Sequence, residues 1–297
     1  MKQIFLNTNF RHDSLVLIEQ CNIIIEDYMF QNLTLSLRQL YYQLVSTNVI
    51  ANKESSYSKL SSVVSNARLA GLIDWSAIED RTRVPSLNPE WKSIAGLVES
   101  AIKSFRLERL VGQETYIELW VEKDALSGVL APIARSYHLP LIVNRGYSSQ
   151  SAMYQSSKRI NRNKKRYGCK NAKILYLGDL DPSGEDMVRD IEDRMFIFDA
   201  QVDDVVKIAL NINQVEEYNL PPNPTKLTDS RASDFIEKYG NNSWEVDALP
   251  PNILSKLIYS EIAKYFNTEL YSEIIIQEEI QINELTKMME YLEDGEE

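Results

Sequence analysis

The sequence predicts an α/β protein in three parts: a helical amino-terminal domain at residues 1–110, a parallel-sheet domain at 111–265 and an acidic helical tail at 266–297. Two apolar runs, at 116–121 and 174–178, each lead directly into acidic residues. Buried strands of an open parallel sheet end in this way at the edge where such sheets place their ligands. In the first third of the chain, apolar residues instead recur at helical spacing.

Length and composition predict a globular protein. With 297 residues, 44% of them hydrophobic, the chain can bury the cores of two domains. No apolar run approaches the roughly 18 residues that span a membrane, and the first residues do not resemble a signal peptide. Cys21 and Cys169 form neither a disulfide framework nor a zinc-binding spacing. We therefore expect a cytoplasmic protein without a membrane partner.

The net charge of −11 is unevenly distributed. Residues 1–114 carry 12 basic and 12 acidic side chains, a balance of zero, and residues 115–196 carry 13 and 10, a balance of +3. Residues 197–297 carry 7 and 21, a balance of −14. Because the acidity is confined to the last third, the overall charge does not exclude a nucleic-acid ligand for the rest.

The amino-terminal domain has a helix-turn-helix pattern. Residues 13–30 predict a first helix, and Ser36 with Gln39 forms a capping-box pattern that begins a second. A third helix follows over 57–70, in which residues 57–68 would be the recognition helix, and residues 72–83 could form a wing. The pattern by itself is equally consistent with a generic helical domain.

Three carboxylates follow the apolar strands. Glu122 ends the first, and Asp179 and Asp181 follow the second, where the chain continues through 182–186 into a helical pattern. Converging carboxylates without an obvious basic partner should repel one another, and a divalent cation relieves that repulsion. We therefore expect a site for one or two Mg²⁺ ions, although acidic turns after strands are also common without metal.

These residues resemble a known family. A glutamate after one strand and Asp-x-Asp-x-x-Gly-Glu after another resemble the Toprim domain of topoisomerases, primases and several nucleases. The resemblance covers roughly residues 112–200. It implies that Glu122 and Asp179 hold the main catalytic Mg²⁺, that Asp181 helps to hold a second ion, and that Glu185 is a further acidic position outside the metal's immediate ligands.

A second stretch, Leu37-Arg38-Gln39-Leu40-Tyr41-Tyr42, resembles the Arg-x-x-[Tyr/Phe]-Tyr motif of the winged-helix domain in the A subunit of type IIB topoisomerases and their meiotic double-strand-break relatives. The resemblance implies that Tyr42 is the nucleophile and that Tyr41 packs inward. Arg38 precedes Tyr42 by four residues and shares its helical face, so it could hold the scissile phosphate. Alternatively, both tyrosines are core aromatics and Arg38 is a surface residue.

A third stretch, residues 244–249, resembles the Glu-Ile-[Asp/Glu]-Ala-Leu segment of the same A subunits, whose acids lie near the active site. With it the resemblance covers about residues 30–265. The chain is shorter than the long A subunits and contains no glycine-rich ATP loop, so it is most similar to their compact stand-alone forms. This implies a homodimer, in which the tyrosine of one protomer meets the metal of the other, and a possible separate ATPase B-type subunit.

Basic side chains in both domains are candidate contacts to the phosphates of double-stranded DNA, although a basic run is often a solvated face and Arg81 and Arg83 could pair with neighbouring acids. These candidates are Lys59, Arg68, Arg81, Arg83, Arg145, Lys158, Arg159, Arg162, Lys164, Lys165 and Arg166.

Together these patterns predict Mg²⁺-dependent cleavage of DNA by tyrosine transesterification, without ATP-driven strand passage by this chain alone. Two alternatives stay open. A hydrolytic Toprim endonuclease would use water as the nucleophile, and a non-catalytic winged-helix adaptor would only bind DNA.

Overall fold

A computed structural model describes residues 2–78, 88–144, 146–225, 229 and 231–294, apart from the side chains of 291–294. The helices are α1 (His12–Phe30), α2 (Leu37–Ser46), α3 (Glu54–Leu69), α4 (Ile94–Ser104), η1 (Asp124–Leu126), α5 (Ser127–Ser136), α6 (Gln150–Tyr167), α7 (Pro182–Ile197), α8 (Ile212–Glu217), α9 (Ala232–Tyr239), η2 (Val246–Ala248), α10 (Pro251–Ile262) and α11 (Thr268–Asp294). The strands are β1 (Thr115–Val121), β2 (Leu141–Val143), β3 (Asn171–Leu177), β4 (Asp204–Ala209), β5 (Asn223–Pro224) and β6 (Asn242–Ser243). In the part of the chain so described, no helix has both the length and the apolar character to cross a bilayer.

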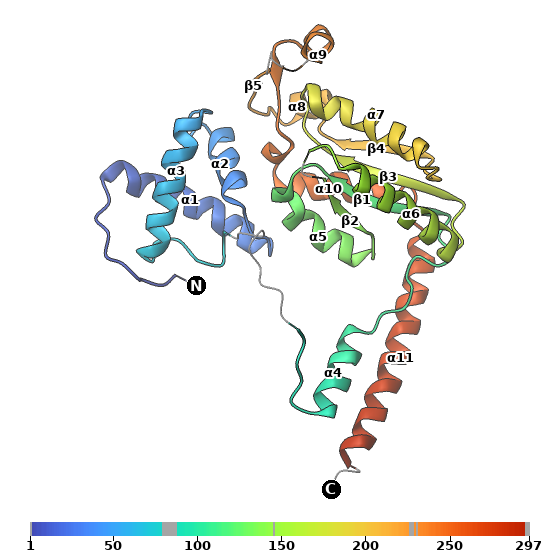
Figure 1. The fold of residues 1–297 in the computed structure, drawn as a ribbon. Coiled ribbons are helices and arrows are strands. Elements are labelled where there is room, and N and C mark those ends of the chain that lie inside the picture. The colour runs from blue at the N-terminus through green and yellow to red at the C-terminus, as the bar shows by residue number, and fades with distance from the viewer. Residues whose placement is uncertain (1, 79–87, 145, 226–228, 230, 295–297) are drawn as a thin grey trace.

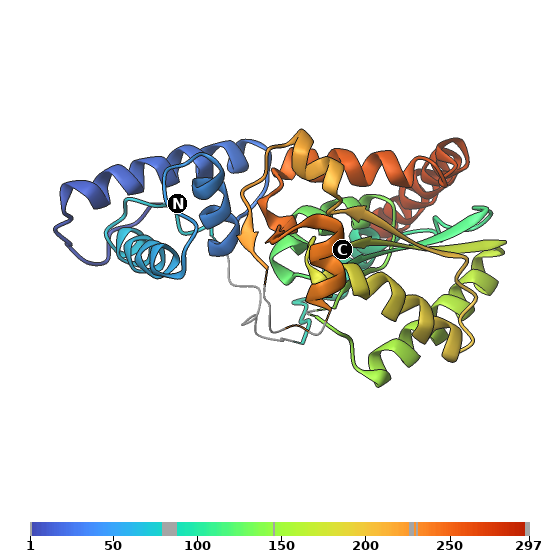
Figure 2. The same ribbon diagram turned by 90° about the horizontal axis from the view of Figure 1, so that it is seen from above.

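The predicted α/β class is confirmed by a parallel sheet of four strands, in the order β2-β1-β3-β4. Helices α5 and α10 pack together on one face, and α6 and α7 pack together on the other (Figures 1 and 2). Every residue of β1 is buried, as expected for a central strand covered on both faces. The strand order reverses between β1 and β3, which is where open α/β sheets bind ligands.

The amino-terminal helices form a separate group beside the sheet domain (Figure 1). The expected capping box is present at the start of α2: Ser36 Oγ accepts a hydrogen bond from the backbone N–H of Gln39 at 3.2 Å, and Gln39 Oε1 accepts one from Ser36 at 2.8 Å. Residues 72–78 form turns with one bridge between Leu35 and Ile78. The rest of the predicted wing lies outside the described residues.

Helices α4 and α11 lie side by side and project away from the sheet domain (Figure 1). At their base, Glu278 of α11 is buried and accepts hydrogen bonds from the backbone N–H of Leu107, at 2.8 Å, and from Nε of Arg109, at 3.2 Å. The predicted acidic tail is therefore a helix that packs along α4 and is fixed to the segment entering β1.

Cys21 provides a test of the helical core. Its thiol is completely buried in α1, and burial raises its pKa to about 12 from 9.0. Because the folded pKa is the higher one, ionisation in the unfolded chain should lower stability as the pH rises above about 9. We expect iodoacetamide to modify Cys21 only after unfolding, at a rate that follows the unfolded fraction, measured by mass spectrometry along a urea titration. Modification of Cys21 at the same rate in native buffer would contradict this packing.

Candidate active site

Two predicted ligands, Glu122 and Asp179, lie side by side at the carboxyl ends of β1 and β3. The backbone N–H of Asp179 donates a hydrogen bond to Oε2 of Glu122 at 3.2 Å. Asp181 is the N-cap of α7, and its Oδ1 accepts a hydrogen bond from the N–H of Gly184 at 2.7 Å. A Cβ atom at Gly184 would lie 2.2 Å from the carbonyl oxygen of Asp179, so this tight turn requires glycine.

The three carboxylates repel one another, as the sequence predicts. Burial raises the pKa of Glu122, and the charges of Asp179 and Asp181 raise it further. Burial likewise raises the pKa of Asp181, and the charge of Asp179 adds to this effect despite the hydrogen bond from Gly184. Both shifts mean that the ionised forms are disfavoured without additional positive charge.

The expectation that these carboxylates lack a basic partner is wrong for Asp179. The Nζ atom of Lys123 lies 2.8 Å from Oδ2 of Asp179 and 3.3 Å from Oδ1 of Asp247, and it also bonds to Glu245. Lys123 directly follows Glu122 where β1 ends, so its ammonium can reach the end of the neighbouring strand. Sequence reasoning missed Lys123, although its place beside Glu122 is a signal that could have identified it.

Arg38 connects the helical domain to this cluster. Its NH2 lies 2.8 Å from Glu245, its Nε lies 3.4 Å from Asp247, and its guanidinium is 5.8 Å from the ring centre of Tyr42. Helix α2 packs against η2, and Nδ2 of Asn52 donates to the carbonyl oxygen of Pro222 at 3.3 Å. The charged groups of the two domains therefore form one network within one chain.

Asp247 is the most deeply enclosed acid of the network. Its side chain is completely buried, and its Oδ2 accepts no hydrogen bond among the described residues, although Arg38 lies nearby. Burial raises the pKa of Asp247, and the charge of Lys123 opposes that rise. The sequence placed this acid near the site only through the resemblance of residues 244–249, and the structure adds its contacts.

Arg38 lines two cavities. One, of about 290 Å³, is lined by Glu122, Lys123 and Gly146. The other, of about 350 Å³, is lined by Tyr41 and Tyr42. Arg38 is the residue common to both, so its guanidinium lies between the tyrosines and the carboxylate edge.

Tyr41 and Tyr42 are both largely buried, with 5% and 6% of their surfaces exposed. The hydroxyl of Tyr41 donates to Oδ1 of Asn52 at 3.0 Å, which fixes that ring in the domain. Burial raises the pKa of Tyr42, and the charge of Asp247 raises it further, whereas Arg38 acts in the opposite direction. In this arrangement Tyr42 is therefore a weakly acidic phenol.

The donor set suits Mg²⁺ in its chemistry, because Glu122, Asp179 and Asp181 offer carboxylate oxygens, the ligands that this hard cation prefers. Across the described ranges, however, no group of three Asp, Glu, His or Cys side chains is arranged to hold an ion. The Asp179 carboxylate is engaged by Lys123 and by the N–H of Val246, at 2.9 Å. A cation at these residues would have to displace the Lys123 ammonium from Asp179.

Several predicted DNA contacts take part in internal interactions. Arg159 pairs with the buried Glu118 at 2.8 Å, and Arg68 donates to the carbonyl oxygens of Trp75 and Ile78 at 2.8 and 3.0 Å. Arg166 pairs with Glu108, and Lys164 lies 3.6 Å from Asp203. Four others are exposed: Lys59, Lys158, Arg162 and Lys165. Arg81, Arg83 and Arg145 lie outside the described residues.

The basic run on α6 is not uniformly close to the carboxylates. Its last turn, with Lys164, Lys165 and Arg166, leads into the amino end of β3, at the edge of the sheet opposite to Asp179. A DNA strand that contacted both would have to extend along the whole length of the sheet. The last turn of α6 and the carboxylates, both predicted to contact DNA or its metal, thus lie at opposite ends of the strands.

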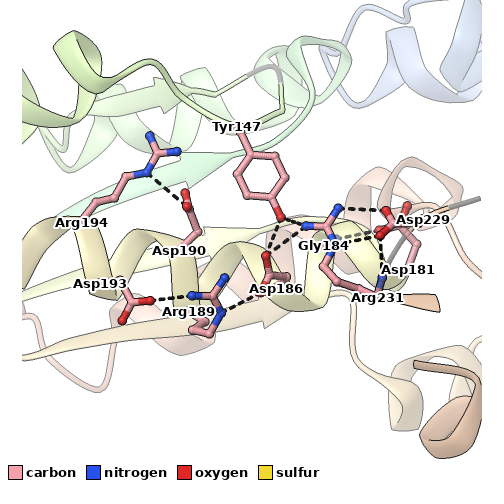
Figure 3. Close-up of polar contacts among 10 residues, drawn as sticks. All are labelled: Tyr147, Asp181, Gly184, Asp186, Arg189, Asp190, Asp193, Arg194, Asp229 and Arg231. Atoms are coloured by element: carbon pink, nitrogen blue, oxygen red, sulfur yellow. Dashed lines mark hydrogen bonds and ion pairs between the residues drawn. The ribbon is translucent and has the colours of Figure 1, made fainter. Parts of the chain in front are cut away.

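A second charged network fixes the loop after β2 (Figure 3). The hydroxyl of Tyr147 donates to Oδ2 of Asp186 on α7 at 2.7 Å, and NH1 of Arg231 lies 3.0 Å from the same oxygen. Arg231 also pairs with Asp229 at 2.8 Å. This network holds Tyr147, and with it the adjacent Gly146 that lines the smaller cavity, against helix α7, whose N-cap is Asp181.

Comparison with protein-family models, with curated proteins and with solved structures finds no match to this chain.

Proposed function

We propose that this chain is a metal-dependent DNA-cleaving enzyme, with Tyr42 as the nucleophile and Glu122, Asp179 and Asp181 as the metal-binding residues. The observation that carries the proposal is the position of Arg38. Arg38 lies beside the Tyr42 ring and pairs with Glu245 and Asp247. Both of these acids also contact Lys123, which pairs with Asp179. Arg38 and Tyr42 come from one motif, and Glu122 and Asp179, which are 80 or more positions later in the chain, come from another. The two motifs thus contribute to one connected network of side chains. We assign the helical domain to the winged-helix class and the sheet domain to the Toprim class on the same motifs.

In the proposed reaction, the phenolic oxygen of Tyr42 attacks a DNA phosphorus atom. A tyrosine–phosphate bond forms, the bond from phosphorus to the 3′ oxygen breaks, and that oxygen leaves as a hydroxyl after taking a proton. Arg38 is suited to hold the non-bridging phosphate oxygens and to favour loss of the phenolic proton. Because burial and the charge of Asp247 oppose that loss in this arrangement, activation requires that the phenol becomes less buried or that positive charge comes closer to it.

When bound, a divalent cation would supply positive charge to balance the developing charge on the phosphate and on the leaving oxygen. Glu122, Asp179 and Asp181 would hold it. Lys123 would then be released toward Glu245 and Asp247, which it already contacts. We propose double-stranded DNA as the substrate, a homodimer as the working form and an ATPase B-type subunit as a possible partner.

A hydrolytic endonuclease is the second candidate. It is favoured by the burial and raised pKa of Tyr42, which make that phenol a poor nucleophile in this arrangement. In this version Glu122, Asp179 and Asp181 keep their role, water attacks the phosphorus, and Tyr42 contacts DNA only.

The two candidates are separated by incubating supercoiled plasmid with the protein and Mg²⁺, then denaturing it with and without protease. We expect DNA covalently bound to protein with the wild type and with Tyr41→Phe, the matched control, and none with Tyr42→Phe. Free cut ends that persist in Tyr42→Phe would indicate hydrolysis. If no variant cuts DNA, the chain is not a nuclease under these conditions and the adaptor alternative gains support.

A further inference from the structure

Asn223, the first residue of β5, is a polar neighbour of Tyr42 that no motif in the sequence singled out. It is half-buried and lines the same cavity of about 350 Å³ as Tyr42 and Asn52. Its side chain forms a hydrogen bond with the Tyr42 hydroxyl. The β5–β6 pair holds its backbone opposite Ser243. A residue far along the chain from Tyr42 therefore reaches the phenol.

The contacts of Asn52 determine which end of the Asn223 amide faces which partner. An amide nitrogen only donates hydrogen bonds, and an amide oxygen only accepts them. Nδ2 of Asn52 donates to the carbonyl oxygen of Pro222 at 3.3 Å, and because a carbonyl can only accept, the atom at this position must be the nitrogen. The same nitrogen donates to Oδ1 of Asn223 at 2.5 Å. The oxygen of Asn223 is therefore turned to Asn52, and its Nδ2 is the atom that can donate to Tyr42.

A donor at this place matters because the phenol is otherwise difficult to ionise. Burial raises the pKa of Tyr42, and the charge of Asp247 raises it further, whereas Arg38 and the hydrogen bond with Asn223 act in the opposite direction. Arg38 also pairs with Glu245, at 2.8 Å, and is the side chain suited to hold the DNA phosphate. The neutral amide of Asn223 has no such competing attraction, so it can stay at the phenolic oxygen when Arg38 turns to the phosphate.

We propose that Asn223 is a hydrogen-bond donor to the nucleophile, with its Nδ2 holding the Tyr42 oxygen and stabilising the phenolate that attacks DNA. Asn52 is a positioning residue, since it acts through Asn223. This role of Asn223 rests on the proposed function of Tyr42 as the nucleophile. A nucleophile that its neighbours stabilise in the ionised form is reactive in a larger fraction of the molecules.

Ionisation at position 42 can be measured in the full chain without DNA or metal. Tyr42 is replaced by difluorotyrosine, whose phenol is more acidic than that of tyrosine and ionises while the protein is folded, and fluorine NMR follows its titration. Asn223→Leu and Asn223→Ala both remove the donor, the first by filling its space with apolar atoms and the second by opening it to water. We expect the midpoint pH to rise by at least about half a pH unit in both variants, which is about a threefold loss of phenolate at a given pH.

Ser243→Ala is the matched control, because Ser243 contacts the backbone oxygen of Asn223, at 3.4 Å, rather than its amide. Its midpoint should equal that of the chain with Asn223 and Ser243 intact. Circular dichroism checks the fold of each variant, and at least one substitution at the half-buried Asn223 should be tolerated. An unchanged midpoint in either folded Asn223 variant would overturn the proposal, since a rise in Asn223→Leu alone would reflect burial.

The titration and the plasmid assay fail independently. A raised midpoint in the Asn223 variants, without covalent DNA in the plasmid assay, would contradict the role of Tyr42 as the nucleophile and keep the hydrogen bond. Covalent DNA together with an unchanged midpoint would contradict the role of Asn223 alone.

Discussion

Replacing Glu118 with alanine is expected to lower the free energy of unfolding by about 3–5 kcal/mol, the usual effect of removing one partner of a buried ion pair. Glu118 is completely buried in β1. It accepts hydrogen bonds from the hydroxyl of Tyr116 at 2.8 Å, from Nε1 of Trp120 at 2.9 Å and from Arg159 at 2.9 and 2.8 Å. Alanine would leave these donors, one of them charged, without their acceptor in the core.

Urea denaturation monitored by circular dichroism measures this change. Glu114→Ala is the matched control: it lies just before the same strand, its side chain is 67% exposed, and its contact with Lys170 is 3.4 Å, so it should change stability by less than about 1 kcal/mol. The double variant Glu118→Leu with Arg159→Met should recover the part of the loss that comes from the unpaired Arg159 charge, while Tyr116 and Trp120 still lack their acceptor. A loss below about 1 kcal/mol in Glu118→Ala would show that the network contributes little.

The same residue shows where sequence reasoning reaches its limit. Apolar runs and their acidic ends predicted β1 and β3, because a central parallel strand is buried on both faces. Most of its consecutive residues are therefore apolar, and such a run can be recognised in the sequence. Arg159, by contrast, lies in a basic run whose spacing is compatible with a DNA-binding face. Its partner Glu118 lies 41 residues away on another element, and no local pattern joins the two.

In the candidate site, too, the sequence predicted some contacts between residues and missed others. Glu122 and Asp179 were predicted as neighbours because strand ends in a parallel sheet share one edge, and the hydrogen bond between them confirms that they are adjacent. The ion pair of Lys123 with Asp179 depends on the direction of a long, flexible side chain, which residue spacing does not determine. The contact of Arg38 with Glu245 depends on how two domains pack, across 207 residues of sequence. Such contacts need the tertiary structure.

Replacing Glu122 with glutamine is expected to leave the metal-free protein as stable as the wild type or more stable, and to reduce DNA cleavage at least about 100-fold. Glutamine keeps the shape of the side chain and removes a charge that Asp179 and Asp181 repel. Because the folded pKa of Glu122 is raised, its ionised form lowers stability as the pH rises through that value, and glutamine avoids this effect. A site kept for function at the expense of stability behaves in this way.

Glu185→Gln is the matched control, with the opposite expected sign. Although burial acts to raise the pKa of Glu185, the charge of Lys207, which lies 2.6 Å away, holds it below its ordinary value. Loss of that charge should therefore lower the melting temperature of the metal-free protein.

Thermal unfolding with and without Mg²⁺ compares the wild type with Glu122→Gln and Glu185→Gln. A ligand at 100 times its dissociation constant raises the free energy of unfolding by about 2.7 kcal/mol. The wild type and Glu185→Gln should gain stability from Mg²⁺, and Glu122→Gln should gain much less. If Glu122→Gln melts well below the wild type without metal, or gains as much from Mg²⁺, then Glu122 is a structural acid and the metal site must be sought elsewhere.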